Sequence, residues 1–327
     1  MSIDAKTPLQ KVLIIKPPPA FPIHESEFSQ HFHFIKASDS PLPLPHFLAA
    51  ANSAGVTALL ASGHVPLNAR DVFDYIPNLR CIVTTTAGLN QIDLPECRRR
   101  GIAVASAGDS YSDDCADHAV ALVIDVLRKV TAADGFVRRG DWSGKGKYCL
   151  GNRLKGKRIG IVGLGSIGCR IAKRSEAFGC KILYNSRKEK PSVSHPYYSD
   201  ICELAANSDA LVISCALTDQ TRHMINKEVL TALGKEGVII NIARGPIIDE
   251  NELVRFLAEG KIAGAGLDVF EKEPNVPKEL LGMDNVVLSP HAAYLTHESF
   301  RDVFELALGN LQAFFSNKPL LSPVMDE

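Results

Sequence analysis

Short apolar segments alternate along the chain with longer stretches in which apolar residues recur every three to four positions. Many short segments are continuously apolar and β-branched, as expected for strands buried on both faces of a parallel sheet. Strand candidates cover residues 11–16, 57–61, 80–85, 102–105, 158–162, 181–184, 210–215, 238–242, 264–269 and 286–288. Helical stretches cover 114–128, 166–178, 250–259 and 297–315. The alternation predicts an α/β fold with doubly wound parallel sheets.

The 327 residues are enough for two domains of ordinary size. We expect a second domain over 111–295, which the long helix 114–128 opens, and a first domain over 1–110 together with 296–327. Segment 135–151 is rich in Gly, Lys and Arg, contains the only tryptophan, Trp142, and reads as a loop. The Pro- and His-rich segment 16–45 shows no strong pattern.

The composition is that of an ordinary soluble protein, with a net charge of −1. This charge favours neither nucleic acid nor an anionic membrane as a partner, and no apolar run has membrane-spanning length. Eight cysteines are scattered without a C-x-x-C pair, so no metal site is expected. Reduced thiols predict a cytoplasmic protein.

A glycine-rich turn, Gly163-Leu-Gly165-Ser-Ile-Gly168, follows a predicted strand and opens a predicted helix. In this context G-x-G-x-x-G is typical of a dinucleotide-binding turn. Gly163 allows the tight turn, Gly165 lets the backbone approach a pyrophosphate, and Gly168 lets helix and strand pack closely. A glycine-rich turn without a ligand is the alternative, which the flanking strands and helix disfavour.

The strand after this helix ends in Asn185-Ser186-Arg187-Lys188. NAD-specific sites place Asp or Glu about 20 residues after the first glycine, to accept a hydrogen bond from the ribose 2′-hydroxyl. Here Asn occupies that place, and Ser186, Arg187 and Lys188 can bind a 2′-phosphate instead. An exposed basic turn is the simpler alternative, but the missing acid favours NADPH over NADH as cofactor.

Three later strands each run into titratable side chains: NIARGP with Arg244, LDVFEKEP with Asp268 and Glu273, and LSPHA with His291. Ligands bind at the carboxyl ends of strands in open α/β sheets. Arg244 can bind a carboxylate and polarise a carbonyl, and His291 can supply a proton. Glu273 can orient the imidazole and favour its protonated form. Each residue alone would be ordinary, but together they predict reduction of a 2-keto acid.

These motifs resemble the signatures of the D-2-hydroxyacid dehydrogenase family over nearly the whole chain, through GLGSIG, NIARGPIIDENELVRFLAEGKIAGAGLDVFEKEP and LSPHAAYLT. The chain is most similar to plant NADPH-dependent glyoxylate/hydroxypyruvate reductases and to hydroxyphenylpyruvate reductases. The resemblance implies a Rossmann cofactor domain inserted in a flavodoxin-like substrate domain. It also implies a homodimer in which Trp142 lies near the partner's substrate crevice.

The resemblance further implies roles for single residues. Arg244, Glu273 and His291 are expected to be catalytic, and substrate is expected to contact Ala87, Gly88, Leu89, Arg244 and His291. Cofactor is expected to contact Gly163, Leu164, Gly165, Ser166, Ile167, Gly168, Ser186, Arg187, Lys188, Cys215, Ile242, Ala243, Arg244 and Asp268. Two positions depart from the family pattern: Leu89-Asn90, where many relatives have an aromatic or apolar residue and then Asp, and Asp117, where relatives usually have Glu.

Other functions remain open from the sequence. The family includes NAD(H)-sensing transcriptional corepressors, phosphoglycerate dehydrogenases and formate dehydrogenases. A corepressor is disfavoured because every expected catalytic residue is present. The sequence also leaves the physiological keto acid open, because hydroxypyruvate, glyoxylate and an aryl pyruvate share the same carboxylate–carbonyl head group.

Overall fold

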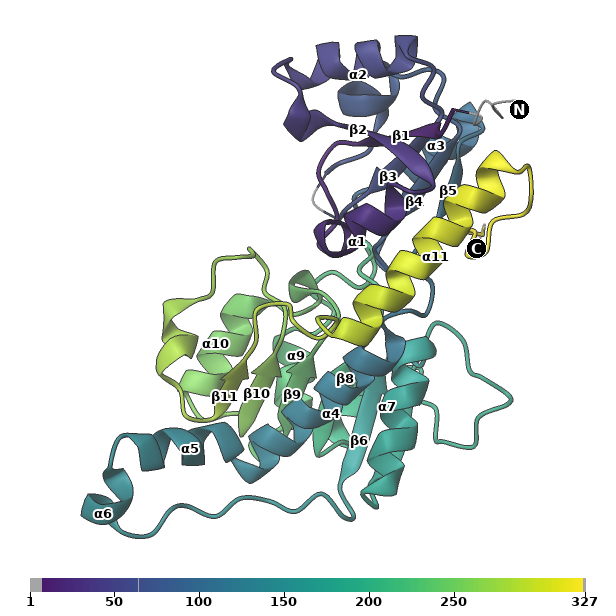
Figure 1. The fold of residues 1–327 in the computed structure, drawn as a ribbon. Helices are drawn as coiled ribbons and strands as arrows, with labels where there is room; N and C mark the ends of the chain where they lie inside the picture. Colours follow the sequence, from purple (N-terminus) through teal and green to yellow (C-terminus); the bar gives the residue numbers. More distant parts are fainter. Residues whose placement is uncertain (1–7, 64, 326–327) are drawn as a thin grey trace. The chain divides into compact units, whose positions relative to one another are not determined.

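The computed structural model describes residues 8–63 and 65–325, which form two compact units (Figure 1). Unit 1 comprises Met1–Tyr111 and Thr296–Glu327, and unit 2 comprises Ser112–Leu295. The ends of the expected first domain, residues 1–7 and 326–327, lie outside the described residues. Unit 2 is inserted in the sequence of unit 1.

Unit 1 contains a five-stranded parallel sheet of order β2-β1-β3-β4-β5. This is the flavodoxin-like order expected from the family resemblance. Its elements are β1 (Gln10–Ile14), α1 (Phe21–Phe28), β2 (Phe32–Lys36), η1 (Ala37–Asp39), α2 (Leu44–Ser53), β3 (Ala58–Ala61), η2 (Ala69–Phe73), β4 (Cys81–Thr84), α3 (Leu94–Arg100), β5 (Ala103–Ala105) and α11 (His297–Phe315).

Helices cover both faces of this sheet, because successive strand residues point to opposite sides. Leu13 and Ile82 pack with α2 and α3 on one face. Val12 and Val83 pack with α1 and α11 on the other. The C-terminal helix α11 therefore completes the core of unit 1, although the whole of unit 2 separates it from β5 in sequence.

Unit 2 contains a six-stranded parallel sheet of order β11-β10-β9-β8-β6-β7. A single parallel bridge between Tyr184 and Tyr197 adds a seventh position beside β7. That position corresponds to strand 3 in the dinucleotide-binding order 3-2-1-4-5-6. The elements are α4 (Ser112–Arg128), α5 (Val130–Arg138), α6 (Asp141–Lys145), β6 (Arg158–Val162), α7 (Ser166–Ala177), β7 (Lys181–Asn185), α8 (Ile201–Ala206), β8 (Ala210–Ile213), α9 (Lys227–Leu233), β9 (Val238–Asn241), η3 (Gly245–Ile247), α10 (Glu250–Ala258), β10 (Gly264–Leu267), η4 (Lys278–Gly282) and β11 (Val286–Leu288).

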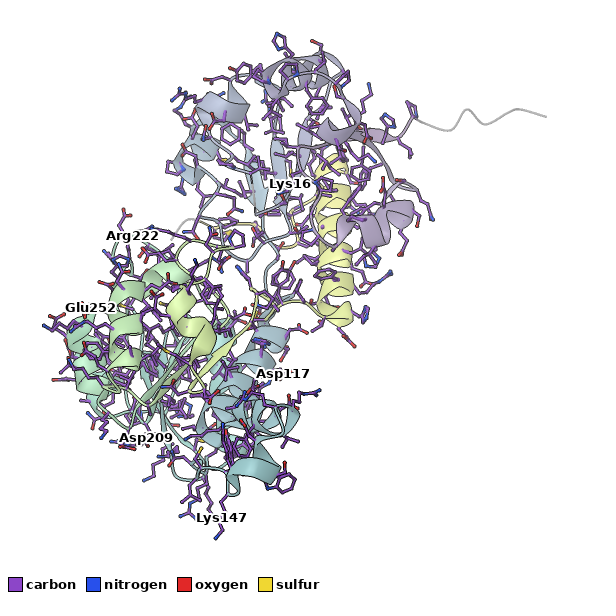
Figure 2. All side chains as sticks on the ribbon, turned by 90° about the vertical axis from the view of Figure 1, so that its left-hand side faces the viewer. Lys16, Asp117, Lys147, Asp209, Arg222 and Glu252 are labelled. Atoms are coloured by element: carbon purple, nitrogen blue, oxygen red, sulfur yellow. The ribbon has the colours of Figure 1, made fainter. Side chains whose placement is uncertain are left out.

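Two apolar cores enclose the sheet of unit 2. Ile159 and Val212 pack with α4 and α7 on one face. Leu211 and Ile239 pack with α8, α9 and α10 on the other. Polar side chains join the first residues of neighbouring strands, as where Asp209, labelled in Figure 2, pairs with Arg158 at 3.1 Å. The two sheets confirm the prediction of doubly wound parallel domains.

One expectation about local structure needs correction, and one segment without a prediction proves to be ordered. Segment 135–151, expected to be a loop, contains the end of α5 and all of α6. Helix α5 starts where the Asp125 carboxylate accepts hydrogen bonds from the Thr131 backbone N–H and hydroxyl, and its interior tolerates Gly135. Segment 16–45, which lacks a clear pattern, contains α1, β2 and the start of α2.

None of the helices in the described part of the chain is long and apolar enough to cross a membrane.

Candidate active site

The glycine-rich turn joins β6 to α7 in unit 2, and its three glycines have different surroundings. Gly163 has a φ of +97°, and a Cβ there would lie 2.6 Å from the Cα of Cys215. Gly168 packs so closely that a Cβ would lie 2.2 Å from the Gly163 carbonyl oxygen. Gly165, the N-cap of α7, has nothing within 4 Å of its Cβ position. The turn therefore leaves open space over Gly165 at the start of a 12-residue helix.

This geometry fits a dinucleotide pyrophosphate. The first N–H groups of a helix have no partners within the helix and carry partial positive charge. Open space at Gly165 lets an anion approach them. Leu164 and Ile167 are buried or partly buried, and the Ser166 hydroxyl oxygen accepts a hydrogen bond from Arg170.

Cys215 lies beside this turn, just after β8. The neighbouring Ser214 hydroxyl donates to the Gly163 carbonyl at 2.7 Å, which ties the end of β8 to the turn. Burial raises the pKa of the Cys215 thiol to about 11, so the side chain is an uncharged wall of the site.

The basic turn after β7 is held from several sides. The Ser186 hydroxyl donates to the Lys188 carbonyl at 2.6 Å, and the Tyr197 hydroxyl donates to the Ser186 carbonyl at 3.3 Å. The Asn185 amide nitrogen donates to the Tyr198 carbonyl at 2.8 Å and to the Ser199 carbonyl at 3.2 Å. Arg187 and Lys188 are exposed.

A buried asparagine shapes the loop that carries Arg244. The Asn241 side chain is 1% exposed, accepts from the Ala243 N–H at 3.0 Å and donates to the Arg244 carbonyl at 3.0 Å. Gly245 has no room for a side chain, because its Cβ would lie 1.9 Å from the Phe270 carbonyl carbon. Ile242 and Ala243 are buried.

The Arg244 guanidinium is largely withdrawn from solvent and donates to the Ala243 carbonyl at 2.6 Å. Burial lowers the pKa of Arg244 below its usual value, although the negative charge of Glu273 acts to raise it. Arginine remains cationic in proteins, so the site holds a permanent positive charge. A substrate carboxylate suits that charge.

His291 and Glu273 form a direct pair. The His291 Nδ1 lies 2.9 Å from Glu273 Oε2, and each side chain is 36% exposed. Glu273 Oε1 accepts from the Phe270 N–H at 3.1 Å. Burial would raise the pKa of Glu273, but the hydrogen bond and charge of His291 outweigh it and hold the pKa below 4.5. His291 also has a left-handed backbone, with φ of +53°.

Asp268 is fully buried and organises the loop that carries His291. Its Oδ1 accepts from the Ser289 hydroxyl at 2.6 Å and from the Ala292 N–H at 2.7 Å, and its Oδ2 accepts from the Ala293 N–H at 3.0 Å. Its backbone carbonyl accepts from the His291 N–H at 2.7 Å. Unit 2 therefore brings Arg244, Asp268, Glu273 and His291 together.

The turn Thr86-Ala87-Gly88-Leu89 belongs to unit 1 and follows β4. The Thr86 hydroxyl donates to the Gly88 carbonyl at 2.8 Å and accepts from Gln91 Nε2 at 3.0 Å. These bonds fix the turn from within. The departure at Asp117, labelled in Figure 2, is satisfied by an ion pair with Arg174 of α7.

Sequence reasoning missed Asn241, Ser289 and His118 as parts of the site. The first two are polar residues at the ends of otherwise apolar strand segments, VIIN and VVLS. His118 is an isolated histidine beside the apolar positions of α4, and its Nε2 lies 2.9 Å from the Ser289 hydroxyl oxygen. Their signal was a polar residue at or next to positions that the pattern gives to apolar residues.

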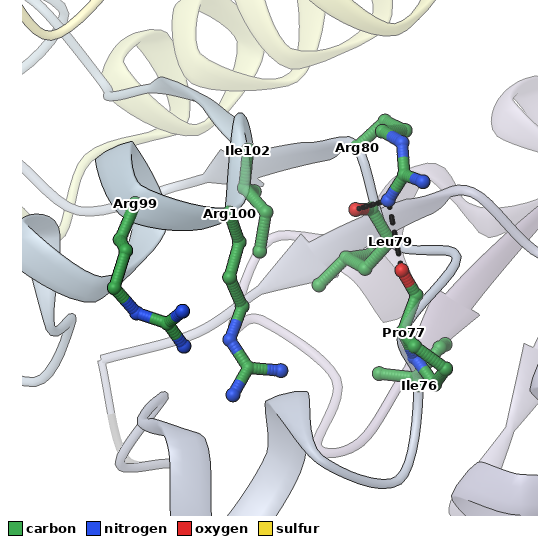
Figure 3. Close-up of a pocket in the computed structure, with 7 residues that line it drawn as sticks. All are labelled: Ile76, Pro77, Leu79, Arg80, Arg99, Arg100 and Ile102. Carbon is green, nitrogen blue, oxygen red and sulfur yellow. Dashed lines mark hydrogen bonds between the residues drawn. The ribbon is translucent and has the colours of Figure 1, made fainter.

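A cavity of about 380 Å³ in unit 1 lies at the opposite end of the sheet, before β4 and β5 (Figure 3). Arg80 donates to the Pro77 and Leu79 carbonyls, and Arg99 and Arg100 both pair with Glu96. These arginines are engaged locally, and the cavity contains none of the predicted site residues. Within the described residues, no group of three or more His, Cys, Asp or Glu side chains is placed to hold a metal ion.

Comparison with known proteins identifies the family. Residues 120–293 match the model for the NAD binding domain of D-isomer specific 2-hydroxyacid dehydrogenases. A glyoxylate/hydroxypyruvate reductase of Arabidopsis thaliana is 49% identical over 96% of this chain and 97% of its own. The hydroxyphenylpyruvate reductase of Plectranthus scutellarioides is 44% identical over 92% of this chain and 95% of its own.

Solved structures agree over the full length. The NADPH-dependent glyoxylate/hydroxypyruvate reductase of Sinorhizobium meliloti, in complex with NADP and malonate, matches with a TM-score of 0.87 and 33% identity over 97% of both chains. A 2-hydroxyacid dehydrogenase of Ketogulonicigenium vulgare matches with a TM-score of 0.90 and 33% identity, over 98% of this chain and 99% of its own. This chain belongs to the D-isomer specific 2-hydroxyacid dehydrogenase family.

Proposed function

We propose that this oxidoreductase reduces a 2-keto acid to the D-2-hydroxy acid and prefers NADPH as the electron donor. The His291–Glu273 pair, at 2.9 Å in the unit that carries the dinucleotide turn, is the observation that supports this best. Relatives named as glyoxylate/hydroxypyruvate and hydroxyphenylpyruvate reductases support the substrate class. Unit 1 is then the substrate domain and unit 2 the cofactor domain.

Each site residue has a distinct task in this reaction. The nicotinamide cofactor supplies the hydride that adds to the carbonyl carbon. Arg244 binds the substrate carboxylate and polarises the carbonyl. Because Nδ1 of His291 is paired with Glu273, Nε2 is the nitrogen that delivers a proton to the developing alkoxide. Glu273 keeps the imidazole in one orientation.

The remaining predicted residues hold the two ligands. Gly163–Gly168 and the first turn of α7 bind the pyrophosphate, and Cys215 lines the cofactor site. Ile242, Ala243 and Asp268 lie on the nicotinamide side. The backbone amides of Ala87, Gly88 and Leu89 bind the substrate carboxylate.

Cofactor preference rests on the turn after β7. Asn185 occupies the position of the acid that would favour NADH, and its amide is engaged with Tyr198. Ser186, Arg187 and Lys188 then bind the 2′-phosphate of NADPH, with the guanidinium as the strongest partner.

Steady-state kinetics with both cofactors test this preference. Arg187→Gln should lower kcat/KM for NADPH by about tenfold or more and leave NADH nearly unchanged, because a hydrogen bond to a charged group is worth about 1.5–3 kcal/mol. Lys181→Gln, an exposed residue at the start of the same strand, is the matched control. Equal kcat/KM for NADPH and NADH in the parent would refute the preference.

The substrate is tested by comparing hydroxypyruvate, glyoxylate and hydroxyphenylpyruvate with NADPH as donor. We expect measurable turnover of at least one of the three. A parent that binds NADPH but turns over none of them would instead favour a binding protein of the same fold.

We also propose a homodimer that forms through α5 and α6. Val130 and Val137 are each 54% exposed, Trp142 is 66% exposed and Leu150 is 92% exposed, an apolar surface suited to a second copy. The dimer places Trp142 near the partner's substrate crevice. Sedimentation should give twice 35.4 kDa, and Val137→Glu should shift it toward the monomer, unlike the control Lys235→Glu, an exposed residue outside this surface. A fully active monomeric parent would contradict the dimer.

The cysteines support a cytosolic location as part of this proposal. All eight lie within the described residues and are free thiols. Free thiols suit a reducing compartment. A fluorescent fusion found in an organelle would refute this location.

A further inference from the structure

His118, on α4, begins a hydrogen-bonded chain toward the loop of His291. Its Nε2 lies 2.9 Å from the Ser289 hydroxyl oxygen and 3.5 Å from Asp268 Oδ1. The Ser289 hydroxyl in turn lies 2.6 Å from Asp268 Oδ1. The His118 side chain is 27% exposed and Asp268 is fully buried, so the chain runs from the rim of unit 2 into its interior.

Hydrogen-bonding capacity fixes the direction of this chain. A hydroxyl has one hydrogen, and an ionised carboxylate only accepts. Ser289 therefore donates its hydrogen to Asp268, and the Ser289 oxygen accepts from His118 Nε2–H. His118 holds the serine hydroxyl in the one rotamer that serves the buried carboxylate.

The buried carboxylate in turn sets the backbone that carries His291. Asp268 accepts from the N–H groups of Ala292 and Ala293, and its own carbonyl accepts from that of His291. The left-handed φ of +53° at His291 is strained for a non-glycine residue and persists only where its surroundings enforce it. An unpaired buried carboxylate is costly, so each donor to Asp268 matters for this loop.

We propose that His118 and Ser289 are positioning residues for the proton donor, acting through Asp268 on the loop of His291. The proposal rests on the proposed function, in which His291 delivers the proton. Neither residue transfers a proton to substrate. Their role is to keep the imidazole within the narrow range of positions from which proton transfer is fast, because a displacement of about 1 Å can cost about a hundredfold in rate.

Two substitutions at one position separate hydrogen bonding from packing. His118→Phe keeps the bulk of the ring and removes the donor, whereas His118→Gln keeps an N–H donor of similar reach. His118→Phe should lower kcat about ten- to a hundredfold, with KM for the keto acid and Kd for NADPH nearly unchanged. His118→Gln should recover most of the loss. Asp117→Asn is the control. Asp117 directly precedes His118 on α4 but pairs with Arg174 of α7, so this substitution should leave kcat unchanged.

A double-mutant cycle tests whether the chain acts as a unit. Ser289→Ala should lower kcat to about the level of His118→Phe, and the double variant should fall little further, because either change breaks the same chain. Losses that multiply in the double variant would overturn the coupling. A phenylalanine variant as active as the parent, or a glutamine variant no better than phenylalanine, would overturn the role of His118.

Amide hydrogen exchange gives a readout that does not depend on turnover. The N–H groups of Ala292 and Ala293 should exchange faster in His118→Phe than in His118→Gln or the parent. Unchanged exchange in His118→Phe would refute the positioning role even if no keto acid were reduced. A parent without turnover, in which the exchange still responds to His118→Phe, would instead refute the proposed function alone.

Discussion

Two alanine substitutions in the glycine-rich turn should affect different properties of the protein, although the chemical change is the same. At Gly165 the added methyl group enters space in which no protein atom lies within 4 Å. At Gly168 it would lie 2.2 Å from the Gly163 carbonyl oxygen and 3.1 Å from the Ser214 hydroxyl. Gly165→Ala should therefore impair cofactor binding, and Gly168→Ala should impair folding.

The expected sizes follow from these distances. Gly165 has φ of −82° and ψ of −156°, which alanine can adopt, so the variant loses at most about 1 kcal/mol as a poorer N-cap. A methyl group in the pyrophosphate's space costs about 1–3 kcal/mol of binding, or about a five- to 150-fold rise in Kd for NADPH. The clash at Gly168 cannot be relieved by a rotamer change, because its neighbour is backbone. We expect a loss of about 3 kcal/mol in stability.

Thermal unfolding and fluorescence titration with NADPH measure the two effects separately. Gly168→Ala should lower Tm by about 6–12 °C, and Gly165→Ala by about 4 °C at most. The reasoning fails if Gly165→Ala binds NADPH as tightly as the parent, because the pyrophosphate would then not lie over this face of the turn. It also fails if Gly168→Ala is as stable as the parent.

Three further substitutions test electrostatics and packing. Burial would raise the pKa of Glu273, but its pairing with His291 outweighs burial and lowers the pKa below 4.5, so the pairing stabilises the fold above about pH 4.5 and is lost as pH falls through the lowered value. The unfolding free energies of Glu273→Gln and the parent should therefore converge as pH falls below about 4.5, and a difference that does not change with pH would refute the pairing. Asn310 is fully buried and makes four hydrogen bonds, two of them with the backbone N–H groups of Leu321 and Ser322. Asn310→Leu should therefore lower the free energy of unfolding in urea by about 3 kcal/mol. A loss below about 1 kcal/mol would contradict this. Asp209→Asn weakens a partly exposed ion pair with Arg158 and should lower the free energy of unfolding by only about 1 kcal/mol in the same assay, because solvent screens the pair. A larger loss would contradict this screening.

Most strands of the two sheets were predictable because burial on both faces leaves runs such as VLII and IGIV with no polar interruption. Strand β2 was not, because it is an edge strand with the mixed sequence FHFIK and is only partly buried. Helices α5 and α6 were missed for a related reason. None of their residues is buried, and Gly135, Gly140, Gly144 and Gly146 give the segment the composition of a loop.

The site divides in the same way. Arg244, Glu273 and His291 follow strands that end at one edge of a sheet, so their convergence in unit 2 could be expected from topology. The left-handed backbone at His291 and the closure of its loop on Asp268 could not, since they depend on three-dimensional contacts with Ser289 and His118. Local pattern carries no information on contacts between residues so far apart in sequence.

The most direct test of the account is kcat for NADPH-dependent reduction of hydroxypyruvate by the parent and by His291→Asn. Asparagine is chosen because it tolerates the left-handed φ of +53° and so removes the acid without adding strain. We expect an active parent and a variant whose kcat is about 10²–10⁴-fold lower, with NADPH binding unchanged. A variant that keeps near-parent kcat would contradict the assignment of His291 as proton donor, and with it the proposed mechanism.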